Sequence, residues 1–146
     1  MSEKMSHNGK IRVLFVCIGN ACRSPMGEAI AKQDAGDVIE ATSAGLYAMG
    51  LIPEMTRTTL EKNGYSADGL WSKGLQAIEP GDVDLVINLS GYERAQALEK
   101  FVQVEYWEVS DPYGADEATY QRILEQIRGH VKELARRLRI EHGARV

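Results

Sequence analysis

Four short apolar runs stand out along the chain, and each has the length of a buried β-strand. The first reads Ile-Arg-Val-Leu-Phe-Val over residues 11–16. Strands of a parallel sheet are covered on both faces, so they show nearly continuous apolar runs rather than strict alternation. The sequence therefore predicts strands over residues 11–16, 38–42, 83–89 and 103–109.

Apolar residues between these runs recur at helical spacing. Ser24 and Pro25 favour a helix start, because serine caps helices and proline suits their first turn, and this helix is predicted to end near residues 34–36. The alternation of strands and helices predicts a single-domain α/β protein with an open, mainly four-stranded parallel sheet and helices on both faces. The other predicted helices span residues 54–62, 91–101 and 115 to about 140.

Composition narrows the class of protein. The 146 residues suffice for one domain, which we assign to residues 11–146, and the polar residues 1–10 are predicted to form a disordered tail. The net charge of −4 argues against a nucleic-acid partner. No apolar run reaches the roughly 18 residues of a membrane span, and the N-terminus lacks the apolar core of a signal peptide. We therefore expect a cytoplasmic protein with neither a nucleic-acid nor a membrane partner.

Cysteine and histidine usage argues against two common kinds of site. Two cysteines are too few for a disulfide scaffold, and with three scattered histidines they leave no zinc-ligand spacing. The sequence thus predicts no metal and no cofactor.

Two loops contain the candidate catalytic and binding residues, and both are expected at one edge of the sheet. Open parallel sheets bind ligands beyond the carboxyl ends of their strands, and residues 17–25 and 110–114 follow the first and the last predicted strand. A tight loop that leads into a helix N-terminus can direct several backbone N–H groups at one anion. The candidates for binding a phosphate-like oxyanion are therefore Ile18, Gly19, Asn20, Ala21, Cys22 and Arg23.

Cys17 and Arg23 lie at the two ends of this loop. The positive end of a helix favours the thiolate of a cysteine, and the donors of arginine match a tetrahedral oxyanion. Together they suit phosphoryl transfer to sulfur. The spacing alone is a weak sign, since a cysteine at a strand end is more often a buried packing residue. The hydroxyl of Ser24 can either cap the helix or bond the thiolate.

Asp111 is the candidate proton donor of the second loop. Pro112 holds it extended, and Gly114 releases the chain into the last helix. The simple alternative is an ordinary turn, but beside the first loop a carboxyl at this edge fits a general acid. Tyr113 either lines the cleft and stacks on an aryl group, or is an exposed loop residue.

Three segments resemble the low molecular weight protein tyrosine phosphatases and occur in that family's order. Residues 13–26 resemble its signature loop, residues 43–45 its second-strand motif and residues 111–114 its general-acid loop. The match runs from Ile11 to about Leu138. It implies the family's fold, a phosphocysteine intermediate without a metal, and a phosphotyrosine-containing protein or small aryl phosphate as partner. Phosphate-like oxyanions are then expected to inhibit the protein.

The resemblance also implies individual roles. Cys17 would be the nucleophile, and Arg23 with the loop amides would bind the phosphoryl oxygens. Asp111 would protonate the leaving alcohol and then activate water. Three residues are implied to steady the thiolate or to hold the loop in shape, namely Ser24, Asn20 and Ser43.

Two departures from the family pattern concern substrate preference rather than chemistry. The family often has two adjacent aromatic residues after Asp-Pro, whereas here only Tyr113 precedes Gly114. The loop after Gly45 lacks the tryptophan common there, and Tyr47 is the candidate replacement as a wall of the cleft.

Cys22 gives the loop a second thiol. A thiol next to an oxidised cysteine can trap the sulfenic acid as a disulfide. The related phosphatases resemble this pattern, so the resemblance implies a reversible Cys17–Cys22 bond under oxidation. The alternative is that Cys22 is a buried packing residue.

The middle of the chain resembles a sister group, the thioredoxin-coupled arsenate reductases, through residues 86–89 and Trp107. Their redox relay needs two further cysteines, whereas Ser90 follows the third strand here and no cysteine follows Cys22. Three hypotheses remain. The main one is a cysteine-dependent phosphatase for phosphotyrosine and aryl phosphates. The alternatives are an arsenate reductase that uses an external thiol such as glutathione or mycothiol, and a non-catalytic phosphate-binding module.

Overall fold

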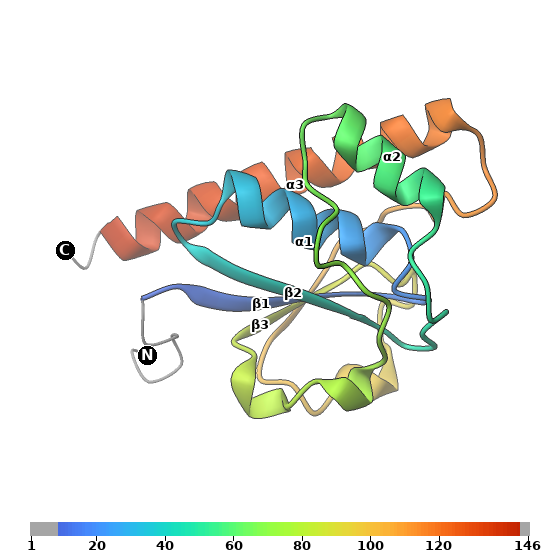
Figure 1. Cartoon of the computed structure of the whole chain (residues 1–146). Helices are drawn as coiled ribbons and strands as arrows, with labels where there is room; N and C mark the ends of the chain where they lie inside the picture. The colour runs from blue at the N-terminus through green and yellow to red at the C-terminus, as the bar shows by residue number, and fades with distance from the viewer. Residues whose placement is uncertain (1–8, 144–146) are drawn as a thin grey trace.

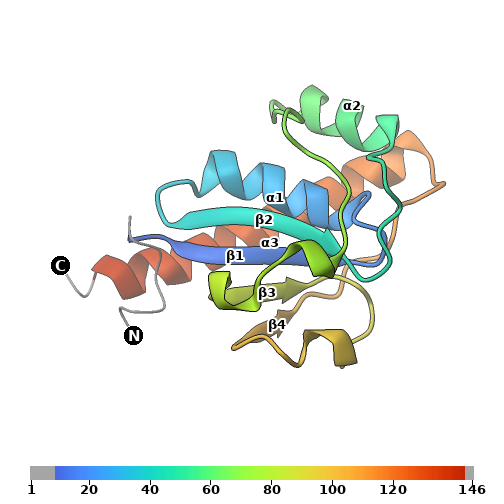
Figure 2. The ribbon, with the colours of Figure 1, turned by 60° about the horizontal axis from the view of Figure 1, so that its bottom comes forward.

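Four parallel strands form the central sheet of the computed structural model, which describes residues 9–143 (Figure 1). Most of the predicted N-terminal tail therefore lies outside the described residues. β1 (Ile11–Cys17) is central, flanked by β2 (Ile39–Gly45) and β3 (Leu85–Asn88), while β4 (Val104–Tyr106) pairs with β3 at the edge. The order β2-β1-β3-β4, which can be followed in Figure 2, confirms the predicted four-stranded parallel sheet.

Helices cover both faces of the sheet. α1 (Arg23–Asp34) and α3 (Glu117–Gly143) lie against one face, the upper one in Figure 1, and α2 (Glu54–Lys62) packs beside them. The opposite face is covered by chain segments that carry only short 3-10 helices. These are η2 (Leu75–Ala77), η3 (Pro80–Asp82) and η4 (Gln96–Leu98).

The side chains of β1 alternate between two cores. Phe15 belongs to the core beneath α1 and α3, whereas Leu14 and Val16 belong to the core on the opposite face. Phe15 and Leu14 are fully buried, and burial of one such side chain contributes about 1.5–3 kcal/mol. Gly27 lets α1 approach closely, since a Cβ there would lie 2.6 Å from the ring of Phe15. This packing holds the start of α1 near the end of β1, where the first candidate loop lies.

The prediction of a helix over residues 91–101 is wrong. The segment forms turns and the short helix η4, and Gly91 has a φ of +89°. The side chain of Asn88 donates to the carbonyl oxygen of Tyr92 at 2.9 Å. Such local side-chain bonds compete with helix formation. The apolar spacing was misleading because Leu98 is buried whereas Tyr92 is 59% exposed.

Several predicted element ends shift. β3 and β4 are shorter than the predicted strands at 83–89 and 103–109, and β4 pairs with the sheet on one side only. β2 extends to Gly45 because it pairs with β1 along its whole length, which places Gly45 opposite Cys17. α3 begins and ends slightly later than predicted, at Glu117 and Gly143.

Two negative findings hold for residues 9–143. Within this range no helix is both long enough and apolar enough to cross a membrane. The same part of the chain contains no cluster of three or more histidine, cysteine, aspartate or glutamate side chains that could hold a metal ion.

Candidate functional site

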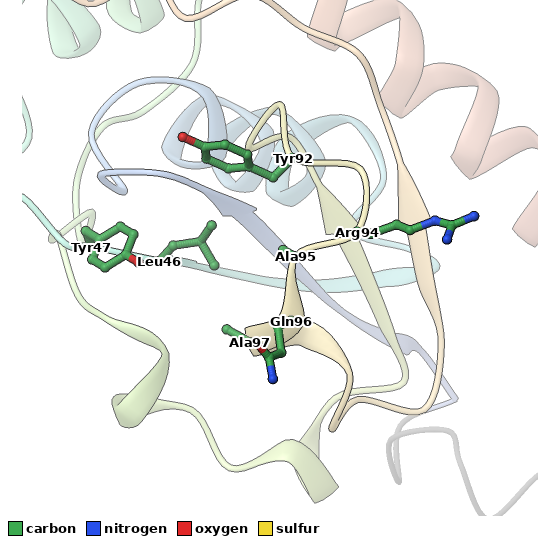
Figure 3. Close-up of a pocket in the computed structure, with 7 residues that line it drawn as sticks. All are labelled: Leu46, Tyr47, Tyr92, Arg94, Ala95, Gln96 and Ala97. Carbon is green, nitrogen blue, oxygen red and sulfur yellow. The ribbon is translucent and has the colours of Figure 1, made fainter.

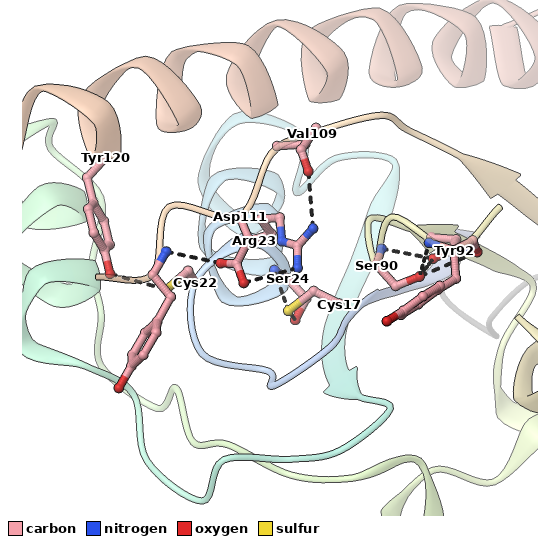
Figure 4. Close-up of polar contacts among 11 residues, drawn as sticks. Cys17, Cys22, Arg23, Ser24, Ser90, Tyr92, Val109, Asp111 and Tyr120 are labelled. Carbon is pink, nitrogen blue, oxygen red and sulfur yellow. Dashed lines mark hydrogen bonds and ion pairs between the residues drawn. The ribbon is translucent and has the colours of Figure 1, made fainter. Parts of the chain in front are cut away.

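Cys17 ends β1, and the loop after it leads directly into α1 (Figure 4). Residue 22 is the N-cap of α1, and its side chain makes no capping hydrogen bond. Ser24 lies inside the helix, with its Oγ 3.0 Å from the Sγ of Cys17, and its N–H donates to that sulfur at 3.4 Å. The sequence left two roles for the Ser24 hydroxyl, a helix cap or a bond to the thiolate. In the structure it does not cap the helix and contacts the sulfur of Cys17.

Asn20 holds the loop in shape. Its φ of +47° lies in the left-handed region, which asparagine tolerates better than most residues. Its Nδ2 donates to the Oγ of Ser24 at 2.8 Å and to the Oγ of Ser43 at 3.0 Å, and its Oδ1 accepts the N–H of Lys73 at 2.8 Å. Because Ser24 accepts from Asn20, its own hydroxyl hydrogen can point to the sulfur of Cys17 at 3.0 Å or to the carbonyl oxygen of Ala44 at 3.4 Å. Asn20 is completely buried and does not line the cleft.

The loop lies directly against the end of β2. A Cβ at Gly45 would lie 2.7 Å from the backbone nitrogen of Asn20 and 2.8 Å from the carbonyl oxygen of Ile18. Only glycine fits this approach without moving the backbone of the loop. From a more distant segment, Ser72 donates to the carbonyl oxygen of Gly19 at 3.1 Å. The loop is thus supported on two sides before any ligand binds.

A buried carboxylate beneath the loop escaped the sequence analysis. Glu28 is 4% exposed, accepts the hydroxyl of Ser43 at 2.6 Å and pairs with the Nζ of Lys32 at 2.6 Å. Through Ser43 and Asn20, this contact connects a charged pair on α1 with the surroundings of Cys17. The helical spacing of residues 24, 28 and 32 is visible in the sequence, but the pairing of Glu28 with a residue of β2 is not.

Arg23 and Asp111 come together from opposite ends of the chain. The Nη1 of Arg23 donates to the carbonyl oxygen of Val109 at 3.1 Å, and its Nη2 lies 3.6 Å from the Oδ2 of Asp111 (Figure 4). The Nε of Arg23 is buried without a hydrogen-bond partner. The Oδ1 of Asp111 accepts the N–H of Tyr113 at 3.1 Å, and this bond restrains the orientation of the carboxylate. An unpartnered buried donor is costly, so the Nε is poised to receive an oxyanion.

A cleft of about 240 Å³ brings the predicted site residues together. Its rim carries Tyr47, 79% exposed, and Tyr113, 57% exposed. Met49 also lines the cleft and was not predicted. The predicted residues that line the cleft are Cys17, Ile18, Gly19, Ala21, Cys22, Arg23, Tyr47, Asp111 and Tyr113.

Cys22 reaches from the loop into the core. Its side chain is buried, and its Sγ lies 3.4 Å from the hydroxyl of Tyr120 on α3. Burial raises the pKa of the Cys22 thiol, while hydrogen bonds with Thr56 and Tyr120 partly oppose this shift. Cys22 is therefore a neutral thiol near pH 7. Both Cys17 and Cys22 are free cysteines in the structure, so their disulfide stays a prediction.

Comparison with known proteins places this arrangement in a family. Residues 12–144 match the family described as low molecular weight phosphotyrosine protein phosphatase. The arsenate reductase of Bacillus subtilis is 32% identical over 131 residues, which cover 84% of this chain and 94% of the relative.

Solved structures of both kinds of enzyme are similar to this fold. An arsenate reductase in the phosphate binding state has a TM-score of 0.80 and 28% identity, with 88% of this chain and 98% of the other covered. The low molecular weight protein tyrosine phosphatase of T. tengcongensis has a TM-score of 0.76 and 30% identity, with 88% and 100% covered. The chain therefore belongs to the low molecular weight phosphotyrosine protein phosphatase family of enzymes.

Proposed function

We propose that this protein is a cysteine-dependent phosphatase that hydrolyses phosphotyrosine or other aryl phosphate monoesters. The observation that carries the proposal is the convergence of Cys17, Arg23 and Asp111 on one cleft whose rim holds two exposed tyrosines. An inorganic oxyanion needs only the loop, whereas aromatic walls suit an aryl group attached to the phosphate.

The first step transfers the phosphoryl group to sulfur. The thiolate of Cys17 attacks phosphorus while Arg23 and the loop amides hold the phosphoryl oxygens, so that an S–P bond forms as the P–O bond to the alcohol breaks. Asp111, initially protonated, gives its proton to the leaving oxygen. Asp111 lines the cleft together with Cys17, where it can reach the leaving oxygen.

The second step regenerates the enzyme. Asp111, now ionised, accepts a proton from water as the water oxygen attacks phosphorus. The S–P bond breaks, inorganic phosphate leaves, and Cys17 departs as a thiolate. The contacts of Ser24 with the sulfur stabilise the negative charge that returns there. No metal takes part in either step.

A second candidate function is arsenate reduction with an external thiol, and the names of matched relatives favour it. Cys17 would displace water from arsenate to form a thiol–arsenate adduct. A thiol such as glutathione or mycothiol would then attack the Cys17 sulfur, which leaves arsenite and a mixed disulfide that a second thiol reduces. We assign the thiol to an external molecule because the relay of the thioredoxin-coupled reductases is missing, since no cysteine follows Cys22 and residue 90 is a serine.

A side-by-side assay separates the two functions. One arm measures hydrolysis of an aryl phosphate and its inhibition by vanadate, and the other measures arsenite formation with glutathione or mycothiol as reductant. We expect vanadate-sensitive hydrolysis that far exceeds any arsenite formation. Thiol-dependent arsenite formation without appreciable hydrolysis would replace the phosphatase proposal by the reductase.

A further inference from the structure

A second hollow adjoins the catalytic cleft and has no part in the proposed chemistry. It measures about 650 Å³ and lies between the loop after β2 and the segment after β3 (Figure 3). Tyr47 lines both this hollow and the cleft, so the two are neighbours with a shared wall. We call it the Tyr47–Tyr92 pocket, and it is lined by Leu46, Tyr47, Tyr92, Arg94, Ala95, Gln96 and Ala97.

The wall of this pocket opposite Tyr47 is the exposed ring of Tyr92, whose backbone is held by hydrogen bonds. Tyr92 is 59% exposed, yet its N–H donates to the Oγ of Ser90 at 3.1 Å and its carbonyl oxygen accepts the Nδ2 of Asn88 at 2.9 Å. Ser90 and Asn88 are buried and bonded to each other at 2.7 Å. A large ring held in solvent by an ordered base loses little conformational freedom when it binds a ligand.

Five of the seven residues that line the pocket are aromatic or aliphatic, and Arg94 and Gln96 are its two polar residues. In Figure 3, Arg94 extends away from Tyr47, whereas Leu46 points towards Ala95. Leu46 and Ala95 are partly buried against the core on this face of the sheet. This mainly aromatic and aliphatic lining suits an apolar side chain.

We propose that the Tyr47–Tyr92 pocket receives an apolar side chain that flanks the phosphorylated residue of a peptide or protein substrate. This inference rests on the proposed phosphatase function and names its substrate class. The shared wall at Tyr47 supports it, because a residue next to a phosphorylated residue in the cleft needs to pass only Tyr47 to reach this pocket. The volume lies in the ordinary range for ligand sites, whereas an inorganic oxyanion does not extend that far.

The test compares a small substrate with peptides. The substrates are 4-nitrophenyl phosphate and phosphotyrosine peptides that carry leucine, alanine or aspartate at the flanking positions. We expect kcat/KM to be highest for a leucine peptide, and Tyr92→Ala to lower that value by about tenfold. Tyr92→Ala should leave 4-nitrophenyl phosphate hydrolysis unchanged, and Tyr92→Phe should retain most of the peptide activity. The matched control is Val102→Ala, which truncates an equally exposed apolar residue outside the pocket.

Binding measurements distinguish failure of this inference from failure of the proposed function. Cys17→Ser removes the nucleophile and keeps the rest of the cleft, so its affinity for labelled phosphopeptides reports the pocket without turnover. We expect the leucine peptide to bind about tenfold more weakly when Tyr92→Ala is added. Equal affinities of Cys17→Ser with and without Tyr92→Ala would overturn the proposed role of the Tyr47–Tyr92 pocket, even if the parent protein hydrolyses every substrate. If the parent protein hydrolyses no substrate but the affinity for the leucine peptide depends on Tyr92, the phosphatase function is overturned and the peptide site is not.

Discussion

Arg23 lies with its Nη2 3.6 Å from the Oδ2 of Asp111, and this ion pair joins the oxyanion loop to the segment that carries the candidate acid. The side chain of Arg23 is 4% exposed and that of Asp111 is 49% exposed, so the guanidinium is fixed and the carboxylate is the accessible partner. The bond from Arg23 to the carbonyl oxygen of Val109 strengthens the connection. In the proposed mechanism an incoming phosphate therefore meets a carboxylate and a guanidinium that already lie together, rather than two loops that must first find each other.

Substitution of the nucleophile separates binding from turnover. Cys17→Ser should abolish hydrolysis, because a serine hydroxyl in this loop is a far weaker nucleophile than a thiolate. Binding of vanadate or phosphate should persist, since Arg23 and the loop remain. Steady-state assays together with calorimetric titration check both points. Appreciable turnover by a pure Cys17→Ser protein would remove Cys17 from this role.

The acid can be tested through leaving groups. Asp111→Asn should lower the rate of hydrolysis by ~10²–10⁴-fold, because the leaving oxygen no longer receives a proton. The loss should be larger for phenyl phosphate than for 4-nitrophenyl phosphate, since nitrophenolate leaves readily without protonation. The measurement is the dependence of kcat/KM on leaving-group pKa for both proteins. If the two slopes coincide, another residue is the acid.

The hydrogen bonds of Ser43 beneath the loop should contribute to the free energy of unfolding. Ser43→Ala removes the bond to Glu28 and one acceptor of Asn20, so we expect the free energy of unfolding to fall by about 1–3 kcal/mol. Hydrolysis should also slow, because Asn20 positions the hydroxyl that contacts the nucleophile. Urea unfolding measures the first effect. Ser66→Ala is the control; it removes an exposed hydrogen bond from the N–H of Asp68 and should lower the free energy of unfolding by less than Ser43→Ala does. A Ser43→Ala protein that matches this control would show that the buried contacts contribute no more than this exposed bond.

The second cysteine should decide whether oxidation is reversible. We expect peroxide to inactivate the parent protein through a Cys17–Cys22 disulfide and thiol reductants to restore activity. The raised pKa keeps Cys22 protonated and slows its own oxidation, so Cys22 remains a thiol that can trap the sulfenic acid of Cys17. In Cys22→Ser the same dose should leave sulfinic or sulfonic acid on Cys17 and permanent loss of activity. Peptide mass spectrometry identifies the products. Full recovery of the Cys22→Ser protein would refute a protective role.

His130 should make the fold sensitive to mild acid. Its ring stacks on Trp107 with centroids 4.8 Å apart, and burial lowers the pKa of His130 although the charge of Glu105 opposes the shift. Between this lowered pKa and the unfolded value of about 6.5, the unfolded chain binds the extra proton. The free energy of unfolding should therefore fall as the pH drops below about 6.5. His130→Phe keeps a ring against Trp107 and should flatten that dependence in urea unfolding at pH 8 and pH 5.5. An unchanged pH dependence would assign the acid sensitivity to other groups.

The sequence by itself determined the sheet and the main chemical groups of the site. Residues 11–26 show why, because the apolar run, the loop with Cys17 and the helix start at Ser24 and Pro25 are all local signals. A strand followed by a tight loop and a helix places a cysteine at a sheet edge whatever the rest of the chain does. Asp111 became a candidate acid only in combination with the first loop and the family resemblance, since Asp-Pro-Tyr-Gly by itself also fits an ordinary turn.

Tertiary structure decided what depends on contacts between distant segments. The segment 91–101 has helical apolar spacing, yet the bonds of Asn88 and Ser90 at the end of β3 hold it in turns instead. The contact of Glu28 with Ser43 depends on α1 packing against β2, so nothing near Glu28 in the sequence indicates it. The Tyr47–Tyr92 pocket likewise arises because loops from two strands meet at one edge of the sheet. Local patterns determine which groups are present, and packing between elements determines which of them touch.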